Sequence, residues 1–580
     1  MSQIQAMGTN PPNTMDRIAA AWAGRLRHRA TIIGTPEPCM IGEPAFGKTI
    51  LEGGILLGGV WCLSDTHVPL RPSSNAAVDA LHQFAWLDDL AALGTPEARA
   101  RAQAGLRGWL AQFGRGGGPG WTAGLAGSRL LRWIAQSAFL LQDMAEDDQA
   151  RFARALTRHA AFLDMQADRA APGLSQIMAC AGRVYGALYL QGRGALLSAA
   201  LGGMAAAARR AIRADGSVAS RNPEALLDHV EPLLWVAHAL ALEERALPES
   251  LGEVLDPVAQ SLRVLRHADG ALARFQGGAS GQARRLAAAL SLHDQLAHRR
   301  LASPPDHAMG FVRLAAGRVS LIVDAAPPPT AAPASAHAST LAFQMTSNRR
   351  ALIVSCGDGE SFGPDLHRAG RATASHSTLA FEGYSSARFT TGRRGAQILM
   401  DGPRNVAFEL RHTADARAAA LGHDGFRASH GLEHTRFLEL SSNGRRLLGE
   451  DTLYAPTLED EARFDMLWHR TRGGAFDFAL RFHLHPDVRA RLDPDQDAVT
   501  LTLGSGEVWR FRAKGHELAL APSIYLEKEA AQPRPSQQIV LSLRANRYTS
   551  QINWRFAKDH GTPLALRDLA ESDPLALPEV

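Results

Sequence analysis

Hydrophobic positions recur at helical spacing through the first half of the chain and at strand spacing through the second. From about residue 75 to residue 300, apolar residues fall three or four positions apart. One such face carries Leu130, Trp133 and Ile134, in a helix that Ser128 is predicted to cap. The same pattern predicts helices over residues 78–93, 97–113, 148–167, 177–190 and 196–212.

A further helix start is indicated by Asn222 and Pro223, because asparagine is a good N-cap and proline suits the first helical position. The helix that follows contains Pro232, where a kink is expected. Helices joined in antiparallel pairs by short loops favour an α/α toroid or a solenoid-like bundle. The pattern does not choose between these two.

After residue 300 the hydrophobic period becomes two. Residues 311–314 and 319–323 predict a hairpin about Gly317, and residues 499–503, 509–511, 539–543 and 552–556 alternate in the same way. Many short strands separated by turns predict an antiparallel sandwich. The expected fold is therefore α+β and multidomain: an N-terminal extension (1–74), a helical α/α toroid-like domain (75–305) and a C-terminal antiparallel β-sandwich domain (306–580).

Composition excludes several classes of function. The net charge of +4 over 580 residues includes no concentrated basic stripe, so no nucleic-acid partner is expected. The four cysteines show no C-x-x-C spacing, which argues against a zinc ribbon or a disulfide framework. We also find no Walker, dinucleotide, H-E-x-x-H or nucleophile-elbow motif.

No segment of the sequence predicts export or membrane insertion. The N-terminus lacks the positive and then apolar run of a secretory signal. The most apolar early stretch, residues 55–63, is much shorter than the roughly 20 residues that span a bilayer. We therefore expect no transmembrane segment.

Three segments in a fixed order carry a family resemblance. They are Ala336-His337-Ala338-Ser339, the strand Ala351-Leu352-Ile353-Val354-Ser355-Cys356-Gly357, and Thr373-Ala374-Ser375-His376-Ser377-Thr378. This series resembles the heparinase II/III-like family of polysaccharide lyases. In that family an H-x-H-A-D stretch, a strand ending in V-D-x-G and a later A-H-N-T segment gather catalytic and metal-binding groups.

The resemblance implies a carbon–oxygen lyase that cleaves an acidic, uronic-acid-containing polysaccharide by β-elimination. In such a reaction one group removes the proton beside the carboxylate, another protonates the departing oxygen, and a third neutralises the carboxylate. The implied partner is an anionic polysaccharide or oligosaccharide. The implied location is the cell envelope or periplasm, with the cytoplasm as the alternative because no signal peptide is visible.

Several of the family's functional groups are replaced in this chain. Residues 169–174 contain no asparagine, and Ala225 and Leu226 stand where a tyrosine is expected after Asn222-Pro223-Glu224. Of three metal ligands that the resemblance implies, His337 and His376 match, but Ser355 replaces an aspartate. Two imidazoles and a serine make a poor zinc site, so we expect no cofactor and regard His337 and His376 as weak metal candidates only.

Two interpretations follow from these replacements. In the first, the active site is rebuilt: Arg221 holds the substrate carboxylate, His376 is the base or acid, and Asn222 and His337 complete the site. His430, His434 and Tyr384 are further candidates. In the second, the chain is a non-catalytic carbohydrate-binding protein that retains the lyase fold.

Overall fold

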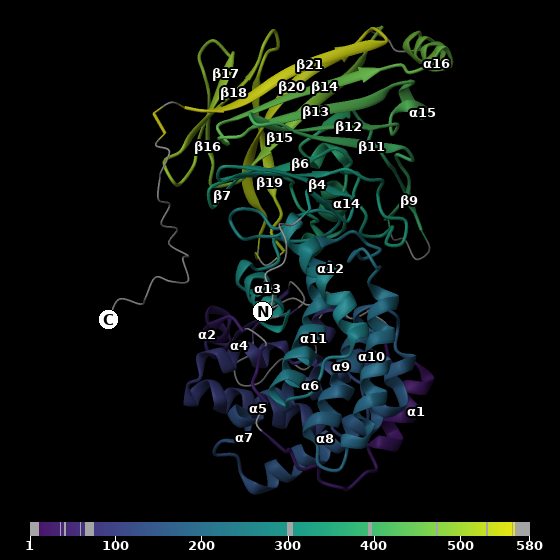
Figure 1. Cartoon of the computed structure of the whole chain (residues 1–580), viewed down its shortest axis with the longest axis vertical. Helices are drawn as coiled ribbons and strands as arrows, with labels where there is room; N and C mark the ends of the chain where they lie inside the picture. The colour runs from purple at the N-terminus through teal and green to yellow at the C-terminus, as the bar shows by residue number, and fades with distance from the viewer. Residues whose placement is uncertain are drawn as a thin grey trace. The chain divides into compact units, whose positions relative to one another are not determined.

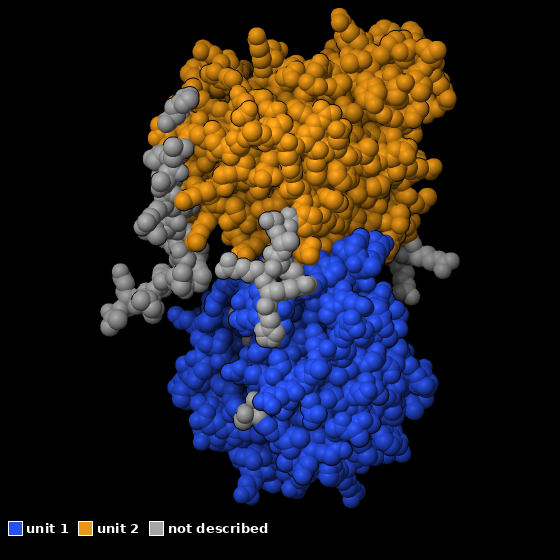
Figure 2. Space-filling view, viewed as in Figure 1, with its two compact units in different colours: residues 1–218, 225–259, 284–302 blue, residues 219–224, 260–283, 303–580 orange. Residues whose placement is uncertain are grey.

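The structure is a computed structural model, which describes residues 11–34, 36–39, 42–57, 60–63, 75–297, 305–392, 397–470, 474–528, 530, 532–559 and 561–562. The chain forms two compact units (Figure 2). Unit 1 comprises residues 1–218, 225–259 and 284–302, and unit 2 comprises residues 219–224, 260–283 and 303–580. The predicted boundary at residue 305 marks the change from helices to strands, but unit 2 also takes two segments from the helical half. Residues 298–304, at that boundary, lie outside the described residues.

The helical half follows the predicted pattern (Figure 1). Its helices are α1 (Thr14–Ala23), α2 (Pro44–Leu51), α3 (Asn75–His82), α4 (Ala85–Leu93), α5 (Pro96–Phe113), α6 (Ala123–Ala135), α7 (Ser137–Leu141), α8 (Glu146–Gln166), α9 (Leu174–Tyr189), α10 (Leu197–Ala211), α11 (Pro223–Leu242), α12 (Glu249–Leu265) and α13 (Ala283–Ala297). The described residues of the stretch 55–63 belong to two short antiparallel strands, β1 (Gly54–Leu57) and β2 (Val60–Leu63).

Helix α6 begins earlier than predicted, and Ser128 is not its cap. The N-cap is Thr122, and Ser128 lies inside the helix, where its hydroxyl donates to the carbonyl of Gln83 at 2.9 Å. Small residues explain the early start. A Cβ on Gly127 would lie 2.2 Å from the Met178 carbonyl oxygen of α9. The start of α6 is therefore a close helix contact, which carries little hydrophobic periodicity.

Helix α11 is long and apolar enough to cross a membrane by length and composition, although 78% of its most apolar window is buried in the structure. It continues through Pro232. Its Asp228 and Glu231 form ion pairs with Arg285 of α13, all three being buried. Helix α11 therefore packs within unit 1 through a largely buried surface.

Unit 2 contains two large antiparallel sheets (Figure 1). The first has the order β19-β20-β15-β7-β6-β5-β4-β3, with β8 also paired to β15, and the second has the order β11-β12-β13-β14-β21-β18-β17-β16. A separate pair is formed by β9 (Arg388–Thr391) and β10 (Gln397–Asp401). The strands of the large sheets are β3 (His307–Ala308), β4 (Phe311–Ala316), β5 (Val319–Asp324), β6 (Phe343–Ser347), β7 (Arg350–Val354), β8 (Leu379–Phe381), β11 (Val406–His412), β12 (Ala416–His423), β13 (Glu433–Ser441), β14 (Arg446–Tyr454), β15 (Phe476–Leu484), β16 (Arg489–Leu492), β17 (Ala498–Thr502), β18 (Val508–Ala513), β19 (Ala519–Tyr525), β20 (Arg534–Ala545) and β21 (Thr549–Lys558).

The two sheets pack face to face around aromatic side chains. Phe343 of β6 stacks on Trp554 of β21, with ring centroids 5.8 Å apart, and Phe482 of β15 contacts the same Trp554 edge-on. The alternating residues predicted for β20 and β21 supply this core, although β20 joins the first sheet and β21 the second. The predicted antiparallel sandwich and the hairpin about Gly317 are confirmed.

Three short helices in unit 2 were not predicted. They are α14 (Pro364–Gly370), α15 (Arg427–His430) and α16 (Leu458–Trp468). Each lies in a connection between strands. Helix α14 carries His367, which lies beside the site described next.

Candidate functional site

The candidate site of unit 2 lies where two loops meet the end of strand β7. His337 is in the loop before β6, and His376 directly follows a 3₁₀ turn, η4 (Thr373–Ser375). Arg371 holds these segments, donating from Nε to the Ala336 carbonyl at 2.9 Å and from Nη2 to the Pro333 carbonyl at 2.8 Å. The backbone NH of Ala338 in turn donates to the Arg371 carbonyl at 2.9 Å. The loop of His337 is thus fixed by hydrogen bonds on both sides of the histidine.

The structure brings His337, His376 and Ser355 together, as the resemblance implied. His376 Nε2 lies 3.3 Å from His337 Nδ1, and His376 Nδ1 lies 3.0 Å from the Ser355 hydroxyl. All three side chains are buried. The two contacts use the two different ring nitrogens of His376, so this imidazole bridges His337 and Ser355.

Asp358 and His367 complete this cluster and were not found from the sequence. The Asp358 carboxylate lies 3.4 Å from His337 Nε2 and 3.0 Å from His367 Nδ1. Gly357 and Gly359 flank it with φ of 109° and 75°, a backbone shape that glycine adopts without strain. The signal available in the sequence was a carboxylate between two glycines, directly after the four residues that match the family's V-D-x-G.

The hydrogen-bond directions in the cluster follow from the carboxylate. Asp358 can only accept, so His337 Nε2 carries the proton and His337 Nδ1 is left as an acceptor. His376 therefore donates from Nε2 to His337, and its free Nδ1 accepts from the Ser355 hydroxyl. The cluster is a chain of polarised bonds that runs from Ser355 through two imidazoles to Asp358.

Burial and neighbouring charges set the protonation of these groups. Burial, reinforced by His337 and His483, holds the pKa of His376 well below its ordinary value, and burial also lowers the pKa of His337. Burial opposes ionisation of Asp358, but hydrogen bonds from His337 and His367 outweigh it and lower its pKa. Asp358 in turn raises the pKa of His367 against the effect of burial. His376 is thus neutral near pH 7, whereas Asp358 and His367 each favour the charged form of the other.

These residues do not fit a zinc ion. Zinc takes four ligands around one centre, whereas Ser355 and Asp358 lie at opposite ends of the two-imidazole chain. Among the residues that the structure describes, no group of three His, Cys, Asp or Glu side chains is arranged to hold a metal. That no zinc binds tightly stays a prediction.

Arg221 is placed differently from its predicted role. Its Nε donates to the Met309 carbonyl at 2.9 Å and its Nη1 to the Pro327 carbonyl at 2.8 Å. Its Nη1 also reaches the Ala326 carbonyl, and its Nη2 donates to the Gly310 carbonyl and to Asp324 Oδ1. These acceptors account for all five N–H groups of a guanidinium. A substrate carboxylate would have to displace them, so Arg221 is a structural residue of unit 2.

Asn222 likewise acts as a structural residue, at the start of α11. Its side-chain oxygen accepts from the backbone NH of Glu224 at 2.9 Å, which confirms the predicted helix cap. Arg221 and His337 are nevertheless connected: Asp324 bonds both Arg221 and Gln276, and the Gln276 side-chain oxygen accepts from the His337 backbone NH at 2.8 Å.

The further candidates of the second half have structural partners. His434 Nε2 lies 2.7 Å from buried Asp451, and His430 stacks on Phe381 with centroids 3.8 Å apart. Tyr384 is 56% exposed and contacts His430 edge-on. Only Tyr384 of these three is open to a ligand.

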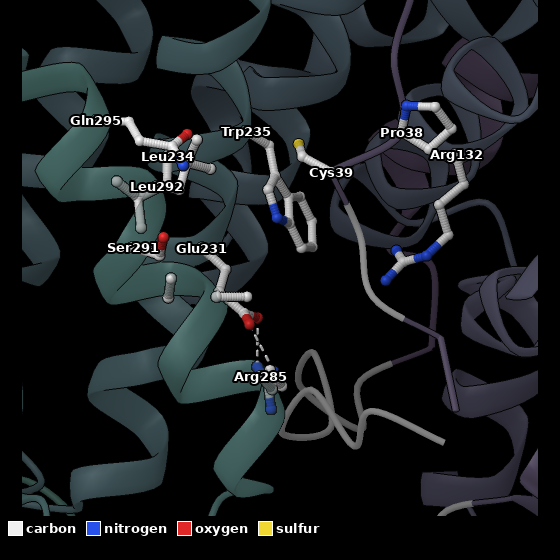
Figure 3. Close-up of a pocket in the computed structure, with 12 residues that line it drawn as sticks. Pro38, Cys39, Arg132, Glu231, Leu234, Trp235, Arg285, Ser291, Leu292 and Gln295 are labelled. Atoms are coloured by element: carbon white, nitrogen blue, oxygen red, sulfur yellow. Dashed lines mark hydrogen bonds and ion pairs between the residues drawn. The ribbon is translucent and has the colours of Figure 1, made fainter. Parts of the chain in front are cut away.

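Unit 1 holds a cavity of about 320 Å³, drawn in Figure 3. The Trp235 ring and the Arg132 guanidinium project into it, and Arg285 pairs with Glu231 on one wall. Arg132 is itself paired with Asp88 at 2.7 Å and lies 5.7 Å from the Trp235 ring. An indole face beside polar side chains can accept a sugar ring or another small polar molecule.

Comparisons with known proteins agree with this architecture. Residues 299–555 match the family model described as heparinase II/III-like, C-terminal. FtsZ-localized protein C of Caulobacter vibrioides is 30% identical over 529 residues, which is 90% of this chain and 89% of that protein.

Two solved structures show the same fold. Heparinase III superposes with a TM-score of 0.64 at 12% identity, over 93% of this chain and 89% of that one. The heparan sulfate lyase HepC of Pedobacter heparinus gives a TM-score of 0.55 at 12% identity, over 95% and 86%. The fold is therefore that of the toroid-plus-sandwich lyases, a helical region followed by antiparallel sheets.

Proposed function

This chain belongs to the heparinase II/III-like family, and from that premise we propose that it binds an anionic, uronic-acid-containing glycan without cleaving it. The observation that carries the proposal is that every N–H group of the Arg221 side chain already has an acceptor within the protein. Its guanidinium is bound to Asp324 and to four backbone carbonyls, so no N–H group is left for a substrate carboxylate.

The remaining groups support the same conclusion. β-Elimination needs a base that meets the substrate and a partner that neutralises its carboxylate. His376 is buried and hydrogen-bonded at both ring nitrogens, and the asparagine and tyrosine positions of the family are occupied by other residues. The fold is retained while the proton-transfer groups are not arranged for the reaction.

The test combines binding and turnover in one preparation. Purified protein is mixed with heparan sulfate, alginate, hyaluronan and bacterial exopolysaccharides, and both retention on the immobilised polymer and ultraviolet absorbance of an unsaturated product are followed. We expect retention on at least one polymer and no rise in absorbance. A rise that is lost in His376→Gln would disprove the non-catalytic assignment.

Arg221 gives a second test of the same assignment. Because Asp324 is fully buried, Arg221→Met leaves an uncompensated carboxylate, and we expect a loss of about 3 kcal/mol of unfolding free energy in urea. The matched control is Arg388→Met, whose side chain is 81% exposed and pairs with Asp401, with an expected loss under about 1 kcal/mol. A stable Arg221→Met protein with weakened glycan binding would instead assign Arg221 to the ligand.

A rebuilt lyase site is the second candidate, favoured by Asp358 and His367. Asp358 raises the pKa of His367, His367 keeps 22% of its side chain exposed, and Asp358 connects it to His337. An imidazolium at the surface of the cluster can neutralise a carboxylate or donate a proton. In this case the absorbance assay gives product, and His367→Gln removes it while Arg221→Lys does not.

The relative's name suggests where the protein works. We propose that this chain, like that protein, localises with FtsZ, so that glycan binding takes place at the division site. A fluorescent fusion expressed from the native locus should concentrate at midcell and disperse when FtsZ is depleted. A reporter that fluoresces only in the cytoplasm distinguishes a cytoplasmic from an envelope or periplasmic position, and uniform fluorescence in dividing cells would contradict the proposal.

A further inference from the structure

A second cluster of reactive groups lies next to the candidate site, and the proposed function does not use it. Its centre is Cys356, which directly follows Ser355 and lies two residues beyond β7. The Cys356 sulfur is 3.5 Å from His483 Nδ1, on β15, and 3.8 Å from Ser523 Oγ, on β19. These three strands belong to the first large sheet (Figure 1). A thiol, an imidazole and a hydroxyl therefore meet at one point in unit 2.

A backbone carbonyl fixes which nitrogen of His483 faces the thiol. His483 Nε2 lies 2.9 Å from the Ala374 carbonyl oxygen, which can only accept, so Nε2 carries a proton. In the neutral imidazole Nδ1 is then an acceptor, and it is this atom that contacts the Cys356 sulfur. The thiol proton can pass to Nδ1, which leaves a thiolate beside an imidazolium. A nucleophile, a base within reach and a third group that orients the base together activate a cysteine.

The Ser523 hydroxyl is shared between the imidazole and the thiol. Its Oγ lies 2.8 Å from His483 Nδ1, so it can donate to this nitrogen while the imidazole is neutral. Once Nδ1 is protonated it no longer accepts, and the hydroxyl donates to the Cys356 thiolate instead. The hydroxyl therefore stabilises the thiolate at the moment when the thiolate forms.

The thiol lies close beneath the surface of unit 2. Cys356 itself is only 4% exposed. Its backbone NH donates to the Ser375 carbonyl at 2.9 Å, and Ser375 is half-buried while the neighbouring Ala374 is exposed. Ser523 is half-buried as well. Small residues at the surface thus cover the sulfur, so a reagent of nearly the size of water can reach it more readily than a bulky one.

We propose that Cys356 is a redox modification site, whose thiol hydrogen peroxide oxidises to a sulfenic acid with His483 as the base. The thiolate sulfur attacks one oxygen of the peroxide, and the S–O bond forms as the O–O bond breaks. The departing hydroxide takes the proton from His483 Nδ1 and leaves as water. The sulfur loses two electrons and the peroxide gains them. This inference goes beyond glycan binding and does not depend on it.

Trapping of the sulfenic acid tests the proposal on the full-length protein. Reduced protein is treated with hydrogen peroxide at pH 7 in the presence of dimedone, and labelling of each cysteine is followed by peptide mass spectrometry. We expect Cys356 to be labelled at least about tenfold faster than Cys39. Cys39 is the matched comparison, because it is half-buried, hence more exposed than Cys356, but contacts the Tyr185 hydroxyl rather than an imidazole. Fully buried Cys180 should stay unlabelled, which shows that the reaction takes place in the folded protein.

Variants of the two partners separate the cluster from the thiol alone. His483→Gln keeps a donor for the Ala374 carbonyl but removes the base, and it should slow labelling of Cys356 at least about tenfold. Ser523→Ala should slow it about fivefold, and Ser523→Thr, which retains the hydroxyl, should restore the natural rate. Thermal unfolding confirms that each variant is folded. The proposal is overturned if Cys356 is labelled no faster than Cys39, or if folded His483→Gln or Ser523→Ala protein reacts at the natural rate.

Discussion

Single side chains in this protein owe their chemistry to their nearest neighbours, and the cysteines illustrate it. The Cys356 thiol lies 3.5 Å from His483 Nδ1. At Cys39 and Cys180, burial is the largest influence on the thiol pKa. Burial opposes ionisation of Cys356 too, but His483 outweighs it and lowers the thiol pKa to about 7. Burial raises the pKa of Cys39 to about 12 and that of Cys180 to about 11.

The first prediction concerns thiol reactivity. Alkylation by iodoacetamide, followed by peptide mass spectrometry at each cysteine, should give Cys356 a rate that levels off above a midpoint near pH 7. Cys39 and Cys180 should still be gaining rate above pH 9. In His483→Gln the Cys356 midpoint should move up by more than about one pH unit. An unchanged midpoint would mean that the imidazole does not stabilise the thiolate.

The candidate site could be predicted only in part. His337, Ser355 and His376 were placed together because each adjoins a strand or turn that the family pattern identifies. Asp358 and His367 were missed because their approach depends on two positive-φ glycines and on α14. That the Arg221 guanidinium is fully hydrogen-bonded within the protein could not be predicted, because its partner Asp324 is 103 residues away in sequence.

Between elements, one carboxylate connects three strands of the second sheet. Asp451 of β14 accepts from Arg436 Nε of β13 at 2.8 Å and from Trp554 Nε1 of β21 at 2.7 Å, and it contacts His434 of β13 at 2.7 Å. Burial by itself raises the pKa of this carboxyl, but Arg436 and His434 outweigh it and hold the pKa below its usual range. The three strands therefore depend on an ionised group in the core.

The second prediction is the resulting pH dependence. A carboxyl whose pKa is depressed on folding stabilises the folded state above its unfolded pKa of about 3.9, and this stability is lost as the pH falls below that value. The unfolding free energy in urea should drop steeply below about pH 5. Asp451→Asn should lose about 3 kcal/mol at pH 7 and show a shallower slope below pH 5. Equal slopes in both proteins would exclude Asp451 as the responsible group.

A third prediction concerns the crossing of α6 and α9. Gly127→Ala places a Cβ 2.2 Å from the Met178 carbonyl oxygen, so we expect a loss of about 3 kcal/mol in urea unfolding. Gly108 of α5 is the control, because a Cβ there meets nothing within 4 Å. Gly108→Ala should stabilise the protein by about 1 kcal/mol through helix propensity. If both variants behave alike, the close helix contact is not a determinant of stability.

Elements with strong periodicity were predictable, and those without it were not. Strands β17, β18, β20 and β21 alternate cleanly because one face of each packs into the sandwich core. The start of α6 consists mostly of alanine and glycine, which pack closely but give no apolar period. Helices α14 to α16 are short insertions between strands, where hydrophobic spacing has too few turns to register.

At the scale of the whole molecule, the two units share the chain in an interleaved order. Residues 260–283 belong to unit 2, where Arg274 and Gln344 exchange hydrogen bonds and Phe275 stacks on Phe311 at 5.2 Å. Gln276 from the same segment supports His337. The change from helices to strands near residue 305 is therefore not the limit of the folding unit.

The fourth prediction follows from this interleaving. Residues 306–580 expressed alone should aggregate or unfold at a lower temperature than residues 260–580, because only the longer chain contains Arg274, Phe275 and Gln276. Differential scanning calorimetry of the two soluble fractions gives the comparison. Identical melting temperatures would show that the segment 260–283 is dispensable for unit 2.

The position of β20 and β21 in the sheets has a consequence for synthesis in the cell. These strands are the last in the sequence, yet β20 lies between β19 and β15, and β21 between β14 and β18. The ribosome releases β4 long before it makes either of them, an interval of roughly 10–50 s at bacterial rates. During that time both sheets have open edges and an exposed core. We therefore expect the nascent chain to need shielding by chaperones until its C-terminal strands emerge, and a ribosome stalled after residue 500 to hold an aggregation-prone protein.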